Sequence, residues 1–259
     1  MKTLTILNTN ARSLCPKIES LVDCMDEMRS IISIITETWL TEAPPPLKQD
    51  LAELEAGAGI GMLCLNRRPN AAGVSHGGVA IAFKSSECSL KEIKLENPAN
   101  FEVLAAAGTL LGYTKKLVVI AAYLPPSYDV NRGRSEVQFL EDTVREMKRI
   151  YKDPFVVLGG DFNQWEIQEV VEDFPDMNES AVGPTWGTRR IDRVFNNFGR
   201  SEIEAGTVPP LEVEPGRPGV ASDHRVAYIR AQLPRLRAFE WTTHQYRYYN
   251  PESVKQFGD

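Results

Sequence analysis

Two short polar strings, far apart in the chain, contain the residues best suited to chemistry. The first is Gly159-Gly160-Asp161-Phe162-Asn163, which directly follows a buried-strand pattern of Phe, Val, Val and Leu. The second, Ser222-Asp223-His224, places an acid next to one of only three histidines in the chain. Asp161 and Asn163 lie on the same face of the strand end, because side chains alternate along a strand. Together with an Asp–His pair, they can activate water and steady a phosphate group.

Polar residues also end or interrupt other predicted strands. They are Asn8-Thr9-Asn10, Glu37, Tyr123 and Asp192. Each has a plain structural explanation when taken alone, such as capping a turn, starting a loop, packing in the core or pairing with a neighbouring Arg. However, functional residues gather where strands stop and loops begin. The recurrence of complementary residue types at these positions therefore favours one shared site.

Periodicity predicts a mixture of helices and strands. We expect one helix over residues 16–29 and another up to residue 151, starting at a Ser135–Gln138 capping box. Weaker patterns suggest short helices near residues 51–54 and 165–171. The predicted strands are residues 3–8, 31–35, 61–65, 78–84, 88–94, 101–108, 116–124, 154–159, 190–196, 202–208 and 224–231. This order predicts two mixed β-sheets packed together and flanked by helices. The Pro- and Gly-rich loop 209–221 is expected to lie over the site.

Composition limits the classes of function. The 259-residue chain is 42% hydrophobic, lacks an apolar run long enough to span a membrane, and begins with a strand pattern instead of a signal peptide. Its four cysteines form no CxxC pair, which disfavours a zinc site and indicates an intracellular protein with reduced thiols. The net charge of −6 argues against non-specific adhesion to nucleic acid. It is compatible with a metal-dependent nuclease, since the cation supplies positive charge.

Six motifs in collinear order resemble one protein family. They are Leu7-Asn8-Thr9-Asn10, Thr36-Glu37-Thr38-Trp39-Leu40, Ala122-Tyr123-Leu124-Pro125, Gly160-Asp161-Phe162-Asn163, Ile191-Asp192 and Ser222-Asp223-His224. The set resembles the endonuclease/exonuclease/phosphatase superfamily. It is most similar to the apurinic-like endonuclease domain of non-LTR (LINE-type) retrotransposons. The resemblance implies a four-layer α/β sandwich like those of DNase I and exonuclease III. It also implies a divalent-metal-dependent DNA endonuclease whose nick leaves a 3′-hydroxyl for target-primed reverse transcription.

The resemblance assigns the metal and the attacking water to particular residues. Glu37 would be the main ligand of Mg²⁺, or of Mn²⁺, because a hard cation prefers carboxylate oxygen. Asn8 and Asp223 would lie beside it, as direct ligands or through water. Asp161 would orient and deprotonate the water that attacks phosphorus.

The same resemblance assigns the stabilisation of the transition state. Asn163 would contact a phosphate oxygen or position the water, and Asn8 would support the catalytic group. Tyr123 would donate to the phosphate or assist the leaving oxygen. His224, kept cationic by Asp192, would stabilise charge on the phosphorane.

Double-stranded DNA is the implied partner. The expected DNA contacts are Asn10, Arg12, Trp39, Trp186, Arg189 and Ser222. Asn10 stands where many apurinic endonucleases carry Asp, and Ala-Arg follows it instead of Gly-Leu, which weakens a DNA-repair interpretation. Segment 184–190 directly precedes Asp192, where retroelement endonucleases often have a longer hairpin. Its shortness predicts loose target selectivity, or selectivity that resides elsewhere in the protein.

Other functions remain as alternatives at this stage. One is an apurinic/apyrimidinic repair endonuclease, and another is a phosphoesterase of the same superfamily that acts on small phosphodiesters. A silent binding scaffold is disfavoured, because the acids and His224 are all present. We expect an endonuclease domain over residues 1–235 and a linker over residues 236–259 towards a fused reverse transcriptase. The isolated domain is expected to be monomeric, without membrane contact, and to act in the nucleus.

Overall fold

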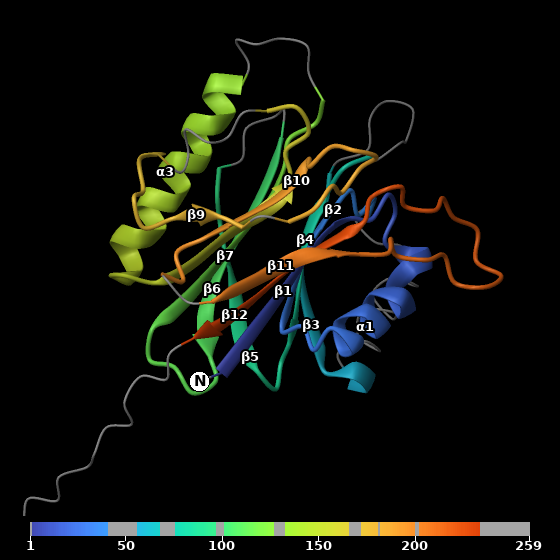
Figure 1. Cartoon of the computed structure of the whole chain (residues 1–259), viewed down its shortest axis with the longest axis horizontal. Coiled ribbons are helices and arrows are strands. Elements are labelled where there is room, and N and C mark those ends of the chain that lie inside the picture. Colours follow the sequence, from blue (N-terminus) through green and yellow to red (C-terminus); the bar gives the residue numbers. More distant parts are fainter. Residues whose placement is uncertain are drawn as a thin grey trace, which may run out of the picture.

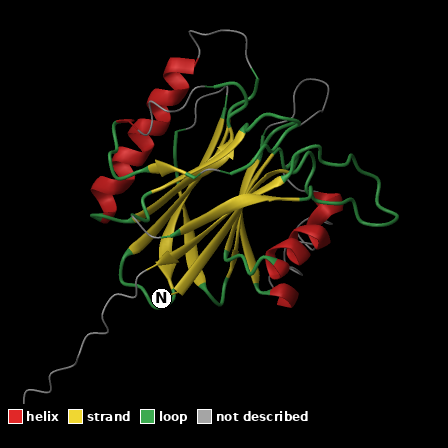
Figure 2. Ribbon diagram, in the orientation of Figure 1, coloured by secondary structure: helices red, strands yellow, loops and turns green. Residues whose placement is uncertain are grey.

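The computed structural model describes residues 2–40, 56–67, 76–96, 101–126, 133–165, 172–180, 182–199 and 202–233. These residues form two six-stranded β-sheets that pack face to face, and a helix covers the outer side of each sheet (Figure 1, Figure 2). The four-layer α/β sandwich predicted from the sequence is therefore confirmed. None of the helices in these residues combines the length and apolarity needed to cross a membrane.

The first sheet contains the strand that begins the described chain. Its strands lie in the order β11-β12-β1-β2-β4-β3. Their bounds are β1 (Lys2–Asn10), β2 (Ile32–Thr36), β3 (Ile60–Leu65), β4 (Val79–Lys84), β11 (Ile203–Val208) and β12 (Val226–Leu233). The 3₁₀ turn η1 (Cys15–Lys17) leads into α1 (Ile18–Glu27). The apolar stripe of α1, including Leu21 and Met25, packs on Leu7 and Ile35 of this sheet.

The second sheet has a similar construction. Its strands lie in the order β5-β6-β7-β8-β10-β9. Their bounds are β5 (Cys88–Ile93), β6 (Glu102–Leu110), β7 (Lys116–Tyr123), β8 (Phe155–Asp161), β9 (Asn178–Glu179) and β10 (Asp192–Asn196). The long helix α3 (Gly133–Tyr151) buries Leu140 and Val144 against Val118 and Val156 on the outer face.

A continuous apolar core lies between the two sheets. Ile6 and Ile34 of the first sheet belong to the same cluster as Val119 and Val157 of the second. The sheets approach so closely at β8 that a Cβ atom on Gly159 would lie 2.7 Å from the Cδ1 atom of Ile34. A larger residue there would force the Ile34 side chain to shift.

The predicted strands all correspond to strands in the structure, and their ends agree within about two residues. The helix predicted over residues 16–29 is η1 followed by α1. The capping-box prediction is wrong, because α3 already begins at Gly133. The amide of Gln138 donates forward to Glu141 and Asp142 instead of back to the helix start. The predicted helix near residues 51–54, residues 166–171 of the other short helix, and the linker 236–259 lie outside the described residues.

The loop 209–221 does not lie over the predicted site, which corrects a second expectation. The Glu214 N–H donates to the Pro16 carbonyl at 2.8 Å. The Glu214 side chain accepts a hydrogen bond from the Glu19 N–H at 2.9 Å, so its charge meets the first turn of α1. The loop therefore lies beside α1, at the right of Figure 1.

Candidate active site

Strand periodicity brings the predicted polar residues to one end of the sandwich. On β1, Ile6 belongs to the inter-sheet core, and Asn8 and Asn10 follow it on the same inner face at steps of two. On β8, Val157 belongs to the same core, and Asp161 follows on that face. The two inner faces therefore direct these side chains towards each other where both strands end.

Strand register then aligns the neighbours of Asp161. Asp161 is the partner of Tyr123 on the parallel strand β7 and of Asp192 on the antiparallel strand β10. Gly160 permits this pairing, because a Cβ atom there would lie 1.8 Å from the Ala122 carbonyl oxygen. The two glycines before Asp161 thus serve close packing, on the facing sheet and on the neighbouring strand.

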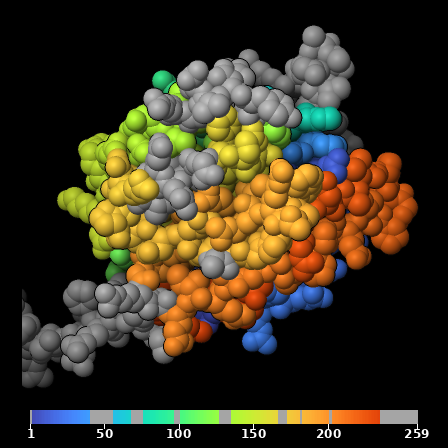
Figure 3. All heavy atoms as spheres, turned by 45° about the horizontal axis from the view of Figure 1, so that its top comes forward, coloured from blue at the N-terminus to red at the C-terminus, as the bar shows by residue number. Residues whose placement is uncertain are grey.

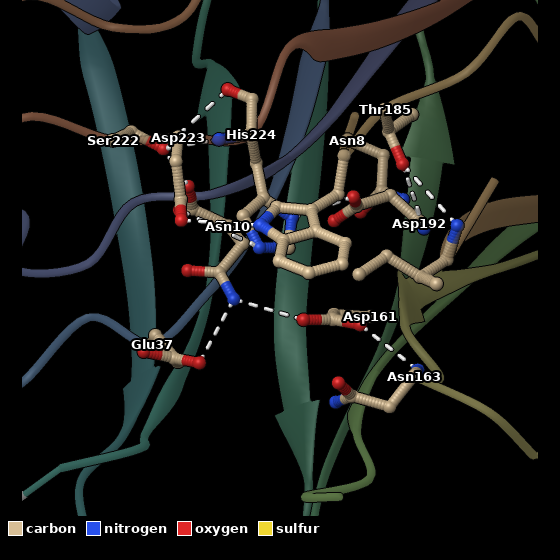
Figure 4. A network of polar contacts seen from close by, with 12 residues as sticks. Asn8, Asn10, Glu37, Asp161, Asn163, Thr185, Asp192, Ser222, Asp223 and His224 are labelled. Atoms are coloured by element: carbon tan, nitrogen blue, oxygen red, sulfur yellow. Dashed lines mark hydrogen bonds and ion pairs between the residues drawn. The ribbon is translucent and has the colours of Figure 1, made fainter. Parts of the chain in front are cut away.

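Asn10 links Glu37 and Asp161 through hydrogen bonds. Its Nδ2 group donates to Glu37 Oε1 at 2.9 Å and to Asp161 Oδ2 at 2.9 Å (Figure 4). Its Oδ1 atom accepts from the Arg12 N–H at 3.1 Å. The side chain is fully buried, so the prediction that Asn10 contacts DNA does not fit its position. A neutral amide can lie between two carboxylates, where a third carboxylate would repel both.

Glu37 is held in an unusual backbone conformation. Its φ angle is 48°, in the left-handed region that non-glycine residues rarely adopt. Tyr123 Oη donates to Glu37 Oε1 at 2.9 Å, and Trp39 Nε1 donates to Glu37 Oε2 at 3.3 Å. Burial and then the charge of Glu37 raise the pKa of Tyr123 far above its usual value. Tyr123 therefore keeps its proton and remains a hydrogen-bond donor.

Asp161 and Asn163 form a tight turn. The Asn163 N–H donates to Asp161 Oδ1 at 2.9 Å, and Asn163 Nδ2 donates to the Leu124 carbonyl at 2.8 Å. Burial and the nearby charge of Asp192 raise the pKa of Asp161, although His224 and the amide donors oppose this shift. A carboxylate with a raised pKa is a stronger base, which suits the removal of a proton from water.

Asp192 and His224 form a buried ion pair. Asp192 Oδ2 lies 2.8 Å from His224 Nδ1, and the Asp192 side chain is fully buried. Burial lowers the pKa of His224, but the hydrogen bond and charge of Asp192, together with the charges of Asp161 and Asp223, outweigh it and raise the pKa overall. The imidazolium form is thus favoured beside Asp161.

The site offers the hard oxygen atoms that a divalent cation prefers. One carboxylate oxygen from each of Asp161 and Asp192 and one ring nitrogen of His224 lie within 4.8 Å of one another. The Oδ1 atoms of Asn8 and Asp192 are buried without a hydrogen-bond partner. These unpaired oxygens, and the Glu37 carboxylate joined to Asp161 through Asn10, suit a divalent cation.

Within the part of the chain that the structure describes, no hydrogen bond joins Glu37 to Asn8 or Asp223, its two predicted neighbours at the metal. Among the described residues, the side-chain contacts of Glu37 are with Asn10, Tyr123 and Trp39. Asn8 instead donates to the carbonyl oxygens of Gly160 at 3.1 Å and Arg193 at 3.3 Å, which ties the two sheets together.

Asp223 lies at the mouth of the site, where it joins two segments. Its Oδ2 atom is 3.1 Å from the guanidinium of Arg12 and accepts from Trp186 Nε1 at 3.1 Å. The neighbouring Ser222 Oγ donates to the Asn10 carbonyl at 2.7 Å and is buried. Ser222 therefore fixes the chain beside β1, and its predicted contact with DNA does not fit this buried position.

A cleft of about 1050 Å³ opens above these residues. Its lining includes Glu37, Asn163 and His224 together with Arg12, Trp39, His76, Trp165, Trp186, Arg189 and Arg190. Trp186 is 41% exposed, and it closes a tight turn through an isolated bridge with Arg189. Figure 3 shows the surface around residues 182–199 (gold) next to that of residues 202–233 (orange). Of the predicted DNA contacts, Arg12, Trp39, Trp186 and Arg189 line the cleft.

Sequence reasoning missed three residues near the site. Thr185 Oγ1 accepts from the Asp192 N–H at 3.1 Å and the Ile191 N–H at 3.3 Å, and so fixes the start of β10. His76 stacks on Trp39 with ring centroids 4.4 Å apart. Lys17 is fully buried behind the loop after β1. Thr185 had a sequence signal, since it begins the polar segment before Asp192, whereas the other two had none.

Comparison with known proteins places this geometry in a family. The model of the Endonuclease/Exonuclease/phosphatase family matches residues 7–224. No curated protein sequence matches the chain. Similar solved structures include an endonuclease/exonuclease/phosphatase from Bacteroides vulgatus, with 13% identity, a TM-score of 0.64, and coverage of 90% of this chain and 100% of the other.

Two further solved structures share the fold. The human Nocturnin catalytic domain with bound sulfate has 13% identity, a TM-score of 0.65, and coverage of 90% of this chain and 95% of the other. The endonuclease domain of TRAS1, a telomere-specific non-LTR retrotransposon, has 13% identity, a TM-score of 0.58, and coverage of 90% and 99%. The family match runs from the first motif on β1 to His224, so the chain belongs to the endonuclease/exonuclease/phosphatase family.

Proposed function

We propose that the chain is a divalent-metal-dependent DNA endonuclease of a non-LTR retrotransposon. The observation that carries this proposal is the network around Asp161. Asp161 is joined to Glu37 through Asn10 and lies beside the Asp192–His224 pair, below a cleft lined by arginines and tryptophans. The similarity in fold to the TRAS1 endonuclease domain, and the retroelement-like motifs, support the choice of DNA as substrate.

Glu37 is the residue that would hold the cation, with Asn8 and Asp223 able to take part directly or through water. A bound divalent cation would neutralise phosphate charge and polarise a phosphorus–oxygen bond. Asn10, Tyr123 and Trp39 each donate a hydrogen bond to the Glu37 carboxylate and so orient it. Tyr123 keeps its proton and can also face the phosphate as a donor.

The remaining residues carry the proton transfer and charge stabilisation. Asp161 takes a proton from water as the water oxygen bonds to phosphorus and the bond to the 3′ oxygen breaks. The 3′ oxygen leaves with the bonding electrons and takes a proton from solvent water, and Asp161 later releases its proton to solvent. The products are a 3′-hydroxyl and a 5′-phosphate. His224, protonated and held by Asp192, stabilises the negative charge that develops on the phosphate oxygens. Asn163 orients the water or a phosphate oxygen.

The DNA is placed by the rim of the cleft. Arg12 and Arg189 can pair with phosphates, and Trp186 and Trp39 offer aromatic faces. The chain carries a net charge of −6, so these few cations act against a repulsive background. Binding should therefore be weak, and it should weaken further as salt is added.

Plasmid nicking at low salt tests the proposal directly. We expect wild type with Mg²⁺ to convert supercoiled DNA into open circles, and EDTA to abolish this conversion. Asp161→Ala and His224→Ala should each lose roughly 10²–10⁴-fold in rate. Asp142→Ala, which removes an exposed acid from α3, is the matched control and should nick like wild type. Intact plasmid, combined with hydrolysis of small phosphodiesters, would support the phosphoesterase alternative instead.

The chemistry of the nick tests the retroelement role. A reverse transcriptase should extend the nicked strand without prior phosphatase treatment, since a free 3′-hydroxyl is required. Preference for an abasic oligonucleotide over an intact one would favour the repair alternative. In the full-length protein we propose a fused reverse transcriptase and action in the nucleus, with the isolated domain acting as a monomer.

A further inference from the structure

A buried lysine lies behind the loop that follows β1. Lys17, the last residue of η1, is fully buried. Its ammonium donates to three consecutive backbone carbonyl oxygens, at 2.7 Å for Ala11, 2.9 Å for Arg12 and 2.9 Å for Ser13. Burial of an ammonium is costly unless its hydrogen bonds are satisfied. Here all three ammonium protons have an acceptor from the same loop.

The backbone of this loop is strained where the lysine binds it. Arg12 and Ser13 have φ angles of 42° and 79°, which side-chain-bearing residues rarely adopt. These conformations turn three successive carbonyls towards one point. Carbonyl oxygens that converge repel one another unless a donor or cation lies between them. Lys17 fills that position and so stabilises a conformation that the loop would not prefer.

The other side of the same loop holds the active site. The Ser13 N–H donates to the Glu37 carbonyl at 2.9 Å, and the Leu14 N–H donates to the Thr38 carbonyl at 2.9 Å. The Arg12 N–H donates to Asn10 Oδ1 and orients the amide that bridges the two acids. The carbonyls of the loop thus face Lys17, and its N–H groups face the residues that fix Glu37.

We propose that Lys17 is a positioning residue, a tethered cation that fixes loop 11–14 and through it sets Asn10 and Glu37. It acts through the backbone and needs no contact with substrate. The assignment rests on the proposed function only for its activity readout, because the loop geometry can be measured without metal or DNA. Burial and then the nearby Arg12 lower the pKa of Lys17 to about 8, so the ammonium form still predominates at pH 7.

Amide hydrogen exchange on the metal-free protein tests this role. Lys17→Met keeps the length of the side chain but removes the charge and donors. We expect the Ser13 and Leu14 amides to exchange at least about tenfold faster in this variant, while Ile6 in the middle of β1 stays protected. Val144→Ala is the control, since it opens the core under α3 on the other sheet, in a cluster that contains no residue of loop 11–14. This control should lower the free energy of unfolding of the whole protein. Exchange of the Ser13 and Leu14 amides should then rise by no more than exchange of the Ile6 amide.

Chemical rescue distinguishes a cation from simple packing. In Lys17→Ala, ethylammonium should restore amide protection and plasmid nicking in a saturable way, whereas tetramethylammonium, which has no N–H donor, should restore neither. Unchanged exchange in Lys17→Met, or equal rescue by both salts, would overturn the proposal. If Lys17→Met does not fold, the Lys17→Ala result decides. If wild type fails to nick DNA, the proposed function fails, but the exchange measurement still decides the role of Lys17.

Discussion

Asn10 shows how a single amide can set the electrostatics of the site. It donates to Glu37 and Asp161 at once, so the two carboxylates share a neutral partner. A protein with Asp at this position would bring three carboxylates together and would depend on cations to hold them. The choice of Asn therefore lets the site keep its geometry before metal binds.

Asn10→Asp tests this interpretation. Without metal, we expect the variant to lose about 1–3 kcal/mol of unfolding free energy, because two hydrogen bonds become repulsive contacts. Added Mg²⁺ should raise the melting temperature of the variant more than that of wild type. Thermal unfolding with EDTA and with Mg²⁺ provides the measurement. Equal stability of both proteins in EDTA would contradict the bridging role.

The Asp192–His224 pair gives a second prediction at the same scale. In Asp192→Asn the hydrogen bond and charge that raise the pKa of His224 are lost or weakened, and burial, which lowers it, remains. The pKa of the imidazole should therefore fall, and the cationic form should be lost at a lower pH than in wild type. An NMR titration of His224 measures this shift. The nicking rate at neutral pH should fall by roughly 10²-fold or more. If the His224 titration is unchanged in the variant, loss of the cationic imidazole is not the reason for the lower rate.

The residues of the site were largely predictable because they end strands, but their partners were not. Asp161 follows a buried apolar run and Asp192 lies in a strand-like segment, and both patterns can be recognised in the sequence. Lys17 lies near the start of a predicted helix and looks like any surface lysine, and only the folded loop reveals its three carbonyl partners. The burial of Asn10 likewise depends on the facing sheet, which no local pattern encodes.

At the level of elements, segment 182–191 connects the cleft to β10. The turn closed by Trp186 and Arg189 is short, with Gly187 at a φ angle of 55°. The Thr185 carbonyl accepts from the Arg225 N–H at 2.8 Å, which links the segment to the start of β12. The segment is thus anchored on both sides, and only the turn is free to vary in length.

Lengthening this turn should sharpen target choice. We expect a hairpin grafted between Trp186 and Arg189 to concentrate the nicks at fewer positions, because a longer element can reach further along the DNA groove. Sequencing of nick positions on a plasmid measures the distribution, and a graft of equal length made only of Gly and Ser is the control. An identical distribution for wild type and graft would show that selectivity lies elsewhere.

The strands were predicted well because each carries its own apolar pattern, whereas loop placement depends on distant partners. Loop 209–221 was expected over the site for its Pro and Gly content alone. Its position is set by Glu214, whose backbone and side chain bind Pro16 and the start of α1. The start of α3 was misplaced for a local reason, since Ser135 lies inside the helix and its hydroxyl donates to the adjacent Glu136.

At the scale of the molecule, Glu102 links stability to pH. This buried acid begins β6 opposite Tyr123 and pairs with Arg67 at 3.3 Å. Burial raises its pKa from 4.5 to about 7, against the opposing effect of Arg67. Between these two values the folded chain holds a proton that the unfolded chain has lost. This contribution to stability is therefore present at low pH and is lost as the pH rises towards 7.

Glu102→Gln should remove this dependence. From pH 5 to pH 8, the unfolding free energy of the variant should rise by about 1–3 kcal/mol relative to that of wild type. The reason is that the amide needs no proton to remain neutral. Urea unfolding of both proteins at several pH values gives the difference between their unfolding free energies. The effects of the other titrating groups cancel in this difference. Parallel curves for the two proteins would show that Glu102 is not the cause.

Neither sheet contains the active site by itself. Asn10 and Glu37 come from the first sheet, whereas Asp161, Asp192 and Tyr123 come from the second, and all meet on the inner faces. A refolding chain can therefore regain strands and helices before it regains any catalytic geometry. We expect the far-ultraviolet circular dichroism signal to recover earlier than nicking activity. The time course of activity would then report when the two sheets dock.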